Sequence, residues 1–282
     1  MQTDSAIPSA VRLGVTAAAH SCAAFSGASP PTGAADTATA ADARAAAFPR
    51  APIPPTAYGA RPSDIVHVRG TGLAARAIRH CLPLAWGNHD ATLIYITPQI
   101  AAGMRLRWTG WAVAEAEPPR FRLTRWPAYW RGLRKHRWQL VFLRVPHLPA
   151  AIAGRVEEHA LAMAACRPRY DRLAILGHFL ACITRANLRW GRQWQWYCTE
   201  AVAEQYYIAG HGARWCPWGI TSMPTPFTTE RRVLSGSLEI IGGSAMLPDP
   251  GIASFAEHLA ALADRLDHRA PSPGPIPAPA PA

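Results

Sequence analysis

The stretch Trp194-Gln-Trp-Tyr-Cys-Thr-Glu-Ala-Val-Ala-Glu-Gln-Tyr-Tyr-Ile-Ala-Gly210 predicts a helix that begins at Cys198 and ends before Gly210. The residues that supply its apolar stripe are Ala201, Val202, Ala203, Ile208 and Ala209. A cysteine in the first turn of a helix lies among N–H groups that lack helical partners, at the positive end of the dipole. Such a position stabilises a thiolate and a developing oxyanion. We therefore expect Cys198 to be a nucleophile, and the alternative is a small buried hydrophobic side chain.

The composition is that of a globular protein with a strong positive charge. The 282 residues include 49 % hydrophobic and 17 % charged side chains, enough for one large packed body. The formal net charge of +11, carried almost wholly by arginine, favours acidic partners such as nucleic acid or anionic lipid, and a general compositional bias explains it equally well. The six cysteines form no C-x-x-C pair and no short-spaced Cys/His grid, so we expect neither a metal site nor a disulfide scaffold. We also expect no cofactor.

The two ends of the chain differ from its centre. Residues 1–50 are rich in Ala, Ser, Thr and Pro and predict a disordered leader, while residues 269–282 predict an extended Pro/Ala tail. The folded body is expected at residues 52–268. No apolar run reaches the roughly 18 residues that a membrane span needs. We expect a cytoplasmic protein, with secretion or a periplasmic location as the alternative, because residues 13–20 only weakly resemble a signal peptide.

Hydrophobic periodicity predicts the order of the elements. Strands are expected at residues 64–69, 91–96, 111–116, 121–126 and 139–145. Helices are expected at residues 150–165, 171–187, 198–209 and 252–267, with a further short helix after Gly72. Antiparallel strands followed by helices predict an α+β fold. Because the chain has no strand–helix–strand alternation and no glycine-rich phosphate loop, nucleotide-dependent chemistry is not expected.

A cysteine nucleophile needs a base to accept its proton. Of the eleven histidines, most fall in the tails, in turns or on helices that do not favour this role, and His67, His80 and His89 remain. His89 stands at the start of a buried strand, where a rigid scaffold can orient the imidazole. We therefore expect His89 to be the base.

The base in turn needs a group that orients it. If residues 89–97 and 107–116 form a hairpin, the midpoint between His89 and Glu115 is residue 102, next to Gly103, and the two side chains lie opposite each other on one face. A carboxylate there fixes the imidazole tautomer. Glu115 is therefore the expected third residue, with Asp90 and Glu117 as alternatives.

Five motifs occur in an order that resembles a known family. They are Ser63-Asp64-Ile65-Val66, Asn88-His89-Asp90-Ala91, Ala114-Glu115-Ala116, Tyr170-Asp171 and Cys198-Thr199-Glu200-Ala201, followed by Thr225-Pro226. Together they resemble the circularly permuted papain-like, NlpC-related (YiiX-like) cysteine hydrolases over about residues 61–227. In that family the histidine strand precedes the cysteine helix, as His89 precedes Cys198. Asp90 replaces a residue that is usually apolar, and this change is expected to perturb the base or to pair with an arginine.

The resemblance implies a permuted papain-like fold and a thiol-dependent hydrolase of the amidase or peptidase type. Cys198 would form an acyl-enzyme, His89 would act as base and Glu115 would orient it. The backbone N–H of Cys198, helped by the Tyr197 hydroxyl or Trp196, would bind the oxyanion. The implied substrates are amides or esters, including cell-wall peptides and lipid acyl groups, so an acyltransferase or thioesterase of the same fold is an alternative.

A second alternative is a binding module without catalysis. Basic and aromatic residues interleave at Arg105, Arg107, Trp108, Trp111, Arg120, Arg122, Arg125 and Trp126. The run at residues 130–137 is also basic. Such a surface could contact an anionic polymer, nucleic acid or an anionic membrane, although a solvated face has the same composition.

Overall fold

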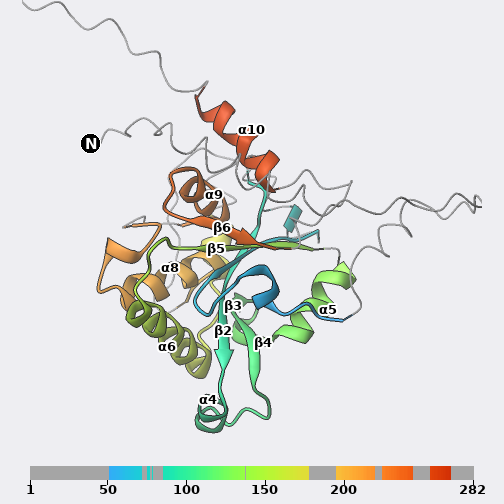
Figure 1. Ribbon diagram of the computed structural model, residues 1–282, viewed down its shortest axis with the longest axis vertical. Coiled ribbons are helices and arrows are strands. Elements are labelled where there is room, and N and C mark those ends of the chain that lie inside the picture. Colours follow the sequence, from blue (N-terminus) through green and yellow to red (C-terminus); the bar gives the residue numbers. More distant parts are fainter. Residues whose placement is uncertain are drawn as a thin grey trace, which may run out of the picture.

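The computed structural model describes residues 51–71, 75–76, 78, 85–136, 138–177, 195–219, 224–243 and 255–267 (Figure 1). The predicted leader at residues 1–50 and the predicted tail at residues 269–282 lie outside this part of the chain. So do His80, His178 and most of the helix expected at residues 171–187, of which residues 172–177 are described and are helical.

A six-stranded antiparallel sheet forms the centre of the described body. In spatial order its strands are β4 (Arg120–Arg125), β3 (Gly110–Glu117), β2 (His89–Ile96), β1 (Ile65–Arg69), β5 (Gln139–Arg144) and β6 (Glu239–Gly242). The strand β1 is central, with β2 on one side and β5 on the other. Its first four residues, Ile-Val-His-Val, are all buried, as expected for a strand covered on both faces.

Helices cover both faces of the sheet (Figure 1). On one face lie α6 (Ala150–Cys166) and α8 (Cys198–Ala209), which pack against β2 and β3. On the other lies α5 (Trp126–His136), whose Trp126, Trp130 and Leu133 join one cluster with Val66, Leu93 and Phe142 of the sheet. The helices α9 (Pro226–Leu234) and α10 (Phe255–Asp267) pack near β6, and α4 (Pro98–Gly103) lies in the β2–β3 connection.

The helix α8 packs closely on the sheet because its inner face is small. Ala201 and Val202 are almost completely buried, so the backbone can approach β2. Polar bonds fix the register of the helix: the Thr92 hydroxyl donates to Gln205 Oε1 at 2.5 Å, and the Tyr206 hydroxyl donates to the carbonyl of Ser63. A helix anchored at several turns holds its first residue, Cys198, at a fixed place beside the sheet.

The α+β class and most predicted elements are confirmed. Each of the five expected strands is present within one or two residues of its predicted bounds, and α8 spans the predicted residues 198–209. The helices α4, α5 and α9 and the strand β6 were not predicted. Within the part of the chain that the structure describes, no helix combines the length and the apolar character needed to cross a membrane.

One position in the loop before β1 is strained. Ser63 has a φ of 70°, in the left-handed region that favours glycine. We expect Ser63→Gly to stabilise the fold by about 0.5–1 kcal/mol, because glycine removes the Cβ conflict at this φ. Urea unfolding measures the change. Ala102→Gly, in the exposed part of α4, is the control and should lose about 0.5–1 kcal/mol. A Ser63→Gly protein less stable than its parent would contradict this reasoning.

Candidate active site

Cys198 is the first residue of α8, and it is buried, with 4 % of its surface exposed. The preceding Tyr197 has extended backbone angles and supplies no side-chain cap. The first N–H groups of a helix have no partners within the helix, so they point toward whatever lies beyond its tip. The thiol therefore sits where both a thiolate and an oxyanion are stabilised.

The structure brings His89 and Glu115 together. His89 Nε2 lies 3.0 Å from Glu115 Oε2, and because a carboxylate only accepts, Nε2 carries the proton and donates it. The other carboxylate oxygen of Glu115 accepts from the Thr124 hydroxyl at 2.7 Å and from Arg122 Nε at 3.3 Å. Glu115 is thus held from two strands, and it fixes both the tautomer and the orientation of the imidazole.

The predicted register between these two residues was wrong. In the structure Thr92 pairs with Ala114 and Ile96 with Gly110, so continuing the ladder places His89 opposite Glu117 rather than Glu115. Glu115 is instead the diagonal neighbour of His89 on the same face, close enough for long side chains to meet. The cause is the turn, which contains α4 and is centred on Gly103 instead of residue 102.

The two alternatives to Glu115 have other partners. Glu117, which is partly exposed, pairs with Arg122. Asp90 is fully buried and bonds to His67 Nδ1 at 2.6 Å. Successive side chains of a strand point to opposite faces, so Asp90 is directed away from the His89–Glu115 pair. Asp90 therefore pairs with a second histidine, His67, and not with an arginine.

Cys198 lies close enough to His89 to act on the titration of its imidazole. Since Nε2 is engaged by Glu115, the nitrogen that remains for the thiol is Nδ1. Burial alone would lower the pKa of His89, but the interactions with Cys198 and with the Glu115 carboxylate outweigh it and raise the pKa to about 10. The hydrogen bond from His89 in turn helps to hold the pKa of Glu115 below its ordinary value, against the effect of burial. Near neutral pH the favoured state of His89 is therefore the imidazolium, paired with the Glu115 carboxylate.

Tyr197 and Trp196, the predicted oxyanion residues, have other hydrogen-bond partners in the structure. The Tyr197 hydroxyl donates its proton to the carbonyl of Pro224 at 2.6 Å, so in this arrangement it does not serve as an oxyanion donor. Its sequence position beside Cys198 gave no sign of this distant partner. Trp196 is half-buried, and its backbone carbonyl accepts from the N–H of Asp171. Of the predicted oxyanion donors, the backbone N–H of Cys198 is the one that lies at the start of a helix.

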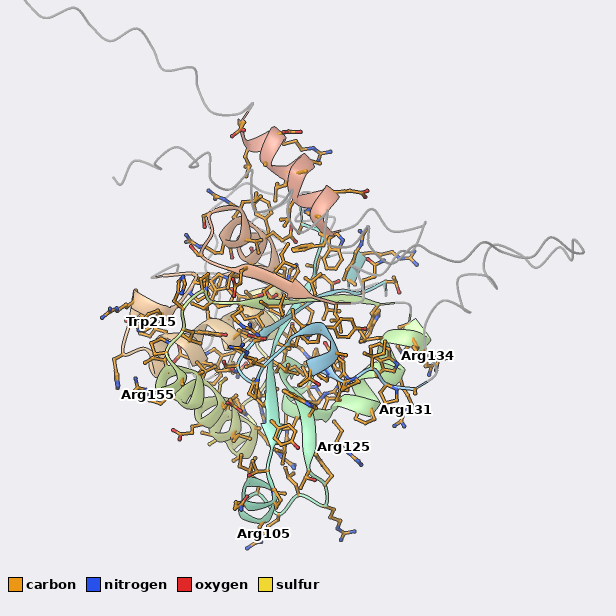
Figure 2. All side chains as sticks on the ribbon, in the orientation of Figure 1. Arg105, Arg125, Arg131, Arg134, Arg155 and Trp215 are labelled. Carbon is orange, nitrogen blue, oxygen red and sulfur yellow. The ribbon has the colours of Figure 1, made fainter. Side chains whose placement is uncertain are left out.

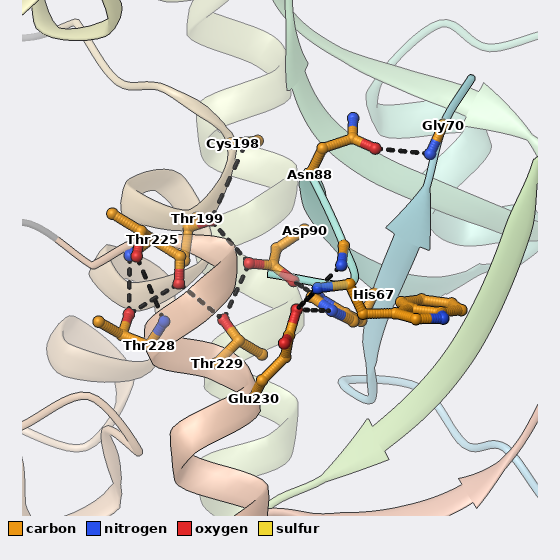
Figure 3. A network of polar contacts seen from close by, with 12 residues as sticks. His67, Gly70, Asn88, Asp90, Cys198, Thr199, Thr225, Thr228, Thr229 and Glu230 are labelled. Atoms are coloured by element: carbon orange, nitrogen blue, oxygen red, sulfur yellow. Dashed lines mark hydrogen bonds and ion pairs between the residues drawn. The ribbon is translucent and has the colours of Figure 1, made fainter. Parts of the chain in front are cut away.

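A buried polar network behind the site was missed by the sequence reasoning (Figure 3). His67 Nε2 lies 3.3 Å from Glu230 Oε1, and His258 Nε2 lies 2.7 Å from Glu230 Oε2. Asp90 Oδ2 accepts from the hydroxyls of Thr199, at 2.6 Å, and Thr229, at 2.9 Å. A histidine inside the otherwise apolar strand Ile65–Val68 was the available signal, because a buried imidazole needs partners.

Other chemistry-bearing residues lie apart from the site. Among the cysteines that the structure describes, Cys166 is exposed and the thiol of Cys216 bonds to the carbonyl of Ala203. The described residues contain no group of three or more His, Cys, Asp or Glu arranged to hold a metal ion.

The predicted basic and aromatic surface is only partly present. Trp126 and Trp130 are buried under the sheet, so they cannot contact a ligand. Arg125 stacks over Trp108 at 5.7 Å, and Arg105 lies at the end of the β2–β3 connection (Figure 2). The exposed cationic side chains therefore lie after α4, along β4 and on α5, and the two tryptophans of α5 are not exposed beside them.

Comparisons with known proteins do not assign this chain to a family. Models of protein families give no match to the sequence. A search of curated proteins likewise returns no match. The functional conclusion therefore rests on the geometry of Cys198, His89 and Glu115.

The His89–Glu115 pair should contribute stability within a defined pH window. The pKa of Glu115 lies below 4.5 in the folded protein, so its contribution is present above that value and is lost as the pH falls through the depressed pKa. The pKa of His89 is raised from 6.5 to about 10, so its contribution is complete below 6.5 and is lost as the pH rises through about 10. Glu115→Gln should cost about 1–3 kcal/mol between these limits.

Urea unfolding of parent and variant at several pH values measures this difference, which should be largest near pH 5–6 and shrink toward pH 10. Glu117→Gln is the matched control, because Glu117 is partly exposed and pairs with Arg122, and it should change stability by less than about 0.5 kcal/mol. Equal losses in the two variants, or a loss independent of pH, would contradict the pairing.

Proposed function

We propose that the protein is a thiol-dependent hydrolase of the amidase or peptidase type that forms an acyl-enzyme at Cys198. The observation that carries the proposal is the convergence of three side chains from distant segments. His89 is hydrogen-bonded to Glu115 at 3.0 Å and lies close enough to Cys198, which begins a helix, to interact with its thiol. This arrangement of nucleophile, base and orienting group is the one that activates a cysteine.

The geometry supports the following reaction. In the reactive thiolate–imidazolium form of the pair the thiol proton has passed to His89 Nδ1, and the thiolate sulfur attacks the carbonyl carbon of an amide, ester or thioester. The C=O π electrons move to oxygen, and the backbone N–H of Cys198 stabilises this oxyanion. The intermediate collapses as the leaving group receives the proton from His89. Water, deprotonated by His89, then attacks the thioester and releases the acid.

The order of the elements supports a permuted papain-like architecture for this site. The histidine lies on β2 of an antiparallel sheet, the carboxylate on the adjacent β3, and the cysteine on a helix that follows both in the chain. The same acyl-enzyme can pass its acyl group to water, an amine or an alcohol. An acyltransferase or thioesterase of the same fold is therefore the closest variant of the proposal, and the acceptor decides between them.

Cys198→Ala should abolish hydrolysis of any amide or ester that the parent turns over, while the thermal midpoint and circular dichroism stay close to those of the parent. The alkylation rate of Cys198 should show a thiolate limb below pH 8 in the parent, and this limb should be lost in His89→Ala, because the imidazolium no longer stabilises the thiolate. Peptide-resolved mass spectrometry measures the rate. Cys166→Ser, at an exposed cysteine, is the control and should match the parent.

Two results would refute the proposal. One is full hydrolytic activity in Cys198→Ala. The other is a Cys198 alkylation profile that is the same in the parent and in His89→Ala, since the two groups would then not be coupled.

A second candidate function is binding of an anionic polymer or membrane surface, favoured by the exposed Arg105, Arg107 and Arg125. Binding to anionic vesicles or to single-stranded nucleic acid would then weaken steeply with added salt and survive Cys198→Ala. Arg105→Gln with Arg107→Gln should reduce it several-fold in a co-sedimentation or filter-binding assay. Binding that is insensitive to salt would remove this candidate.

A further inference from the structure

Asp90 lies at the centre of the buried network, and it joins three different elements. Its carboxylate accepts from His67 Nδ1 on β1, from the Thr199 hydroxyl on α8 and from the Thr229 hydroxyl on α9. The side chain is fully buried, as are those of Thr199 and Thr229 (Figure 3). A buried carboxylate with several strong bonds is fixed in place and fixes its partners in return.

One of these bonds has a direct relation to the proposed catalytic pair. Asp90 is the residue after His89 in β2, and Thr199 is the residue after Cys198 in α8. The 2.6 Å bond between Asp90 and Thr199 therefore ties the start of the strand to the first turn of the helix, one residue away from the imidazole and the thiol. A shift of α8 along the sheet would break this bond and move the sulfur away from His89.

We propose that Asp90 is a positioning residue that sets the distance between Cys198 and His89 through its bond to Thr199, a role that rests on the function proposed above. Asp90 does not touch the reacting atoms. It acts through the register of α8 on β2, and the Thr92–Gln205 bond, farther along the same helix, supports that register from a second point.

His67 and Glu230, the other charged members of the network, keep the Asp90 carboxylate ionised and fixed in position. Both nitrogens of His67 face carboxylate oxygens, so both carry protons and the ring is a cation. Glu230 lies on the side of the His67 ring opposite Asp90, and it also accepts from the N–H groups of Trp86, at 2.8 Å, and Gly87, at 2.9 Å. The His67 ring packs directly against Gly87, so closely that a Cβ at this position would collide with it. This packing restricts the movement of the ring.

The charges near the two ends of this linkage come from several elements. Asp90 is faced by His67 from β1, with Glu230 of α9 and His258 of α10 beyond it. The Cys198–His89 pair is faced by Glu115 and, through it, by Arg122. Glu200 lies in the first turn of α8.

The chain supplies a matched control for Thr199. Thr229 donates to the same oxygen of Asp90, at 2.9 Å, and it is equally buried, but it belongs to α9 and not to the nucleophile helix. It also accepts from the Trp218 indole, so its loss should cost at least as much stability as the loss of the Thr199 hydroxyl. Thr199→Val and Thr229→Val thus remove similar bonds from one carboxylate, and only the first loosens the link to Cys198.

The experiment is the pH profile of Cys198 alkylation by iodoacetamide in the full chain, for the parent and for Thr199→Val, Thr199→Ser, Thr229→Val and His89→Ala. Peptide-resolved mass spectrometry follows the tryptic peptide 193–214, in which Cys198 is the sole cysteine. Thermal unfolding of each protein reports its stability. Because alkylation needs no substrate, the measurement does not depend on knowing what the protein hydrolyses.

We expect Thr199→Val to lose roughly tenfold or more of the alkylation rate below pH 8 and to move the profile toward that of His89→Ala, because small misplacements weaken such pairs strongly. Thr199→Ser restores the hydroxyl and should restore the parent profile. Thr229→Val should keep the parent profile even though its thermal midpoint falls.

The proposal is overturned if Thr199→Val keeps the parent profile, or if Thr229→Val shifts it as much as Thr199→Val does, since a general loss of stability would then explain the effect. A parent without any limb dependent on His89 overturns the proposed function, and the positioning role with it. A parent that has this limb, together with an unchanged Thr199→Val, removes the positioning role alone.

Discussion

The alternation of side chains along β2 is the constraint on which this structure depends. His89 and Asp90 are adjacent in the sequence, so they must point to opposite faces of the sheet. Each meets a partner of opposite charge on a neighbouring strand: Glu115 on β3 for His89, and His67 on β1 for Asp90. One strand start thus organises two histidine–carboxylate pairs, one at the candidate site and one in the core behind it.

Burying so many ionisable groups is expensive unless every charge is paired. In the core, the His67 cation lies between Asp90 and Glu230, and burial, which would lower its pKa, is outweighed so that the pKa rises to about 9. The charges are held by a hydrogen-bonded chain that reaches from β1 to α9 and α10. The network also defines the geometry of the core: α8 and α9 are tied to the sheet, and α10 is tied to α9, by bonds that have little freedom in angle or distance.

The sequence predicted the elements better than the contacts between them. The strands were found because their apolar residues alternate or run together, and the start of α8 was found from the residues that flank Cys198. The proximity of His89 and Glu115 was also anticipated, although for a register that was wrong by two residues. An error of two residues keeps side chains on the same face, whereas an error of one would have separated them.

The buried network was beyond the reach of sequence reasoning because its members are far apart in the chain. Glu230 lies on a helix that was not predicted, and His258 was among the histidines set aside because they fall on helices. Tyr197 shows the same limit, since the carbonyl that accepts its hydroxyl belongs to Pro224 in a distant loop. Periodicity reports which side of an element is buried, but it does not report which distant group will meet a given side chain.

The arginines of β4 have a consequence for how the protein behaves at high concentration. β4 ends the sheet on one side, and its first residue is bridged to Arg169, while Arg122 and Arg125 line the rest of the strand and are exposed. An open edge offers unpaired backbone groups to the strands of other molecules, and charged side chains along it oppose such pairing. The positive charge of this strand therefore protects the sheet against edge-to-edge aggregation, independently of any ligand that the surface binds.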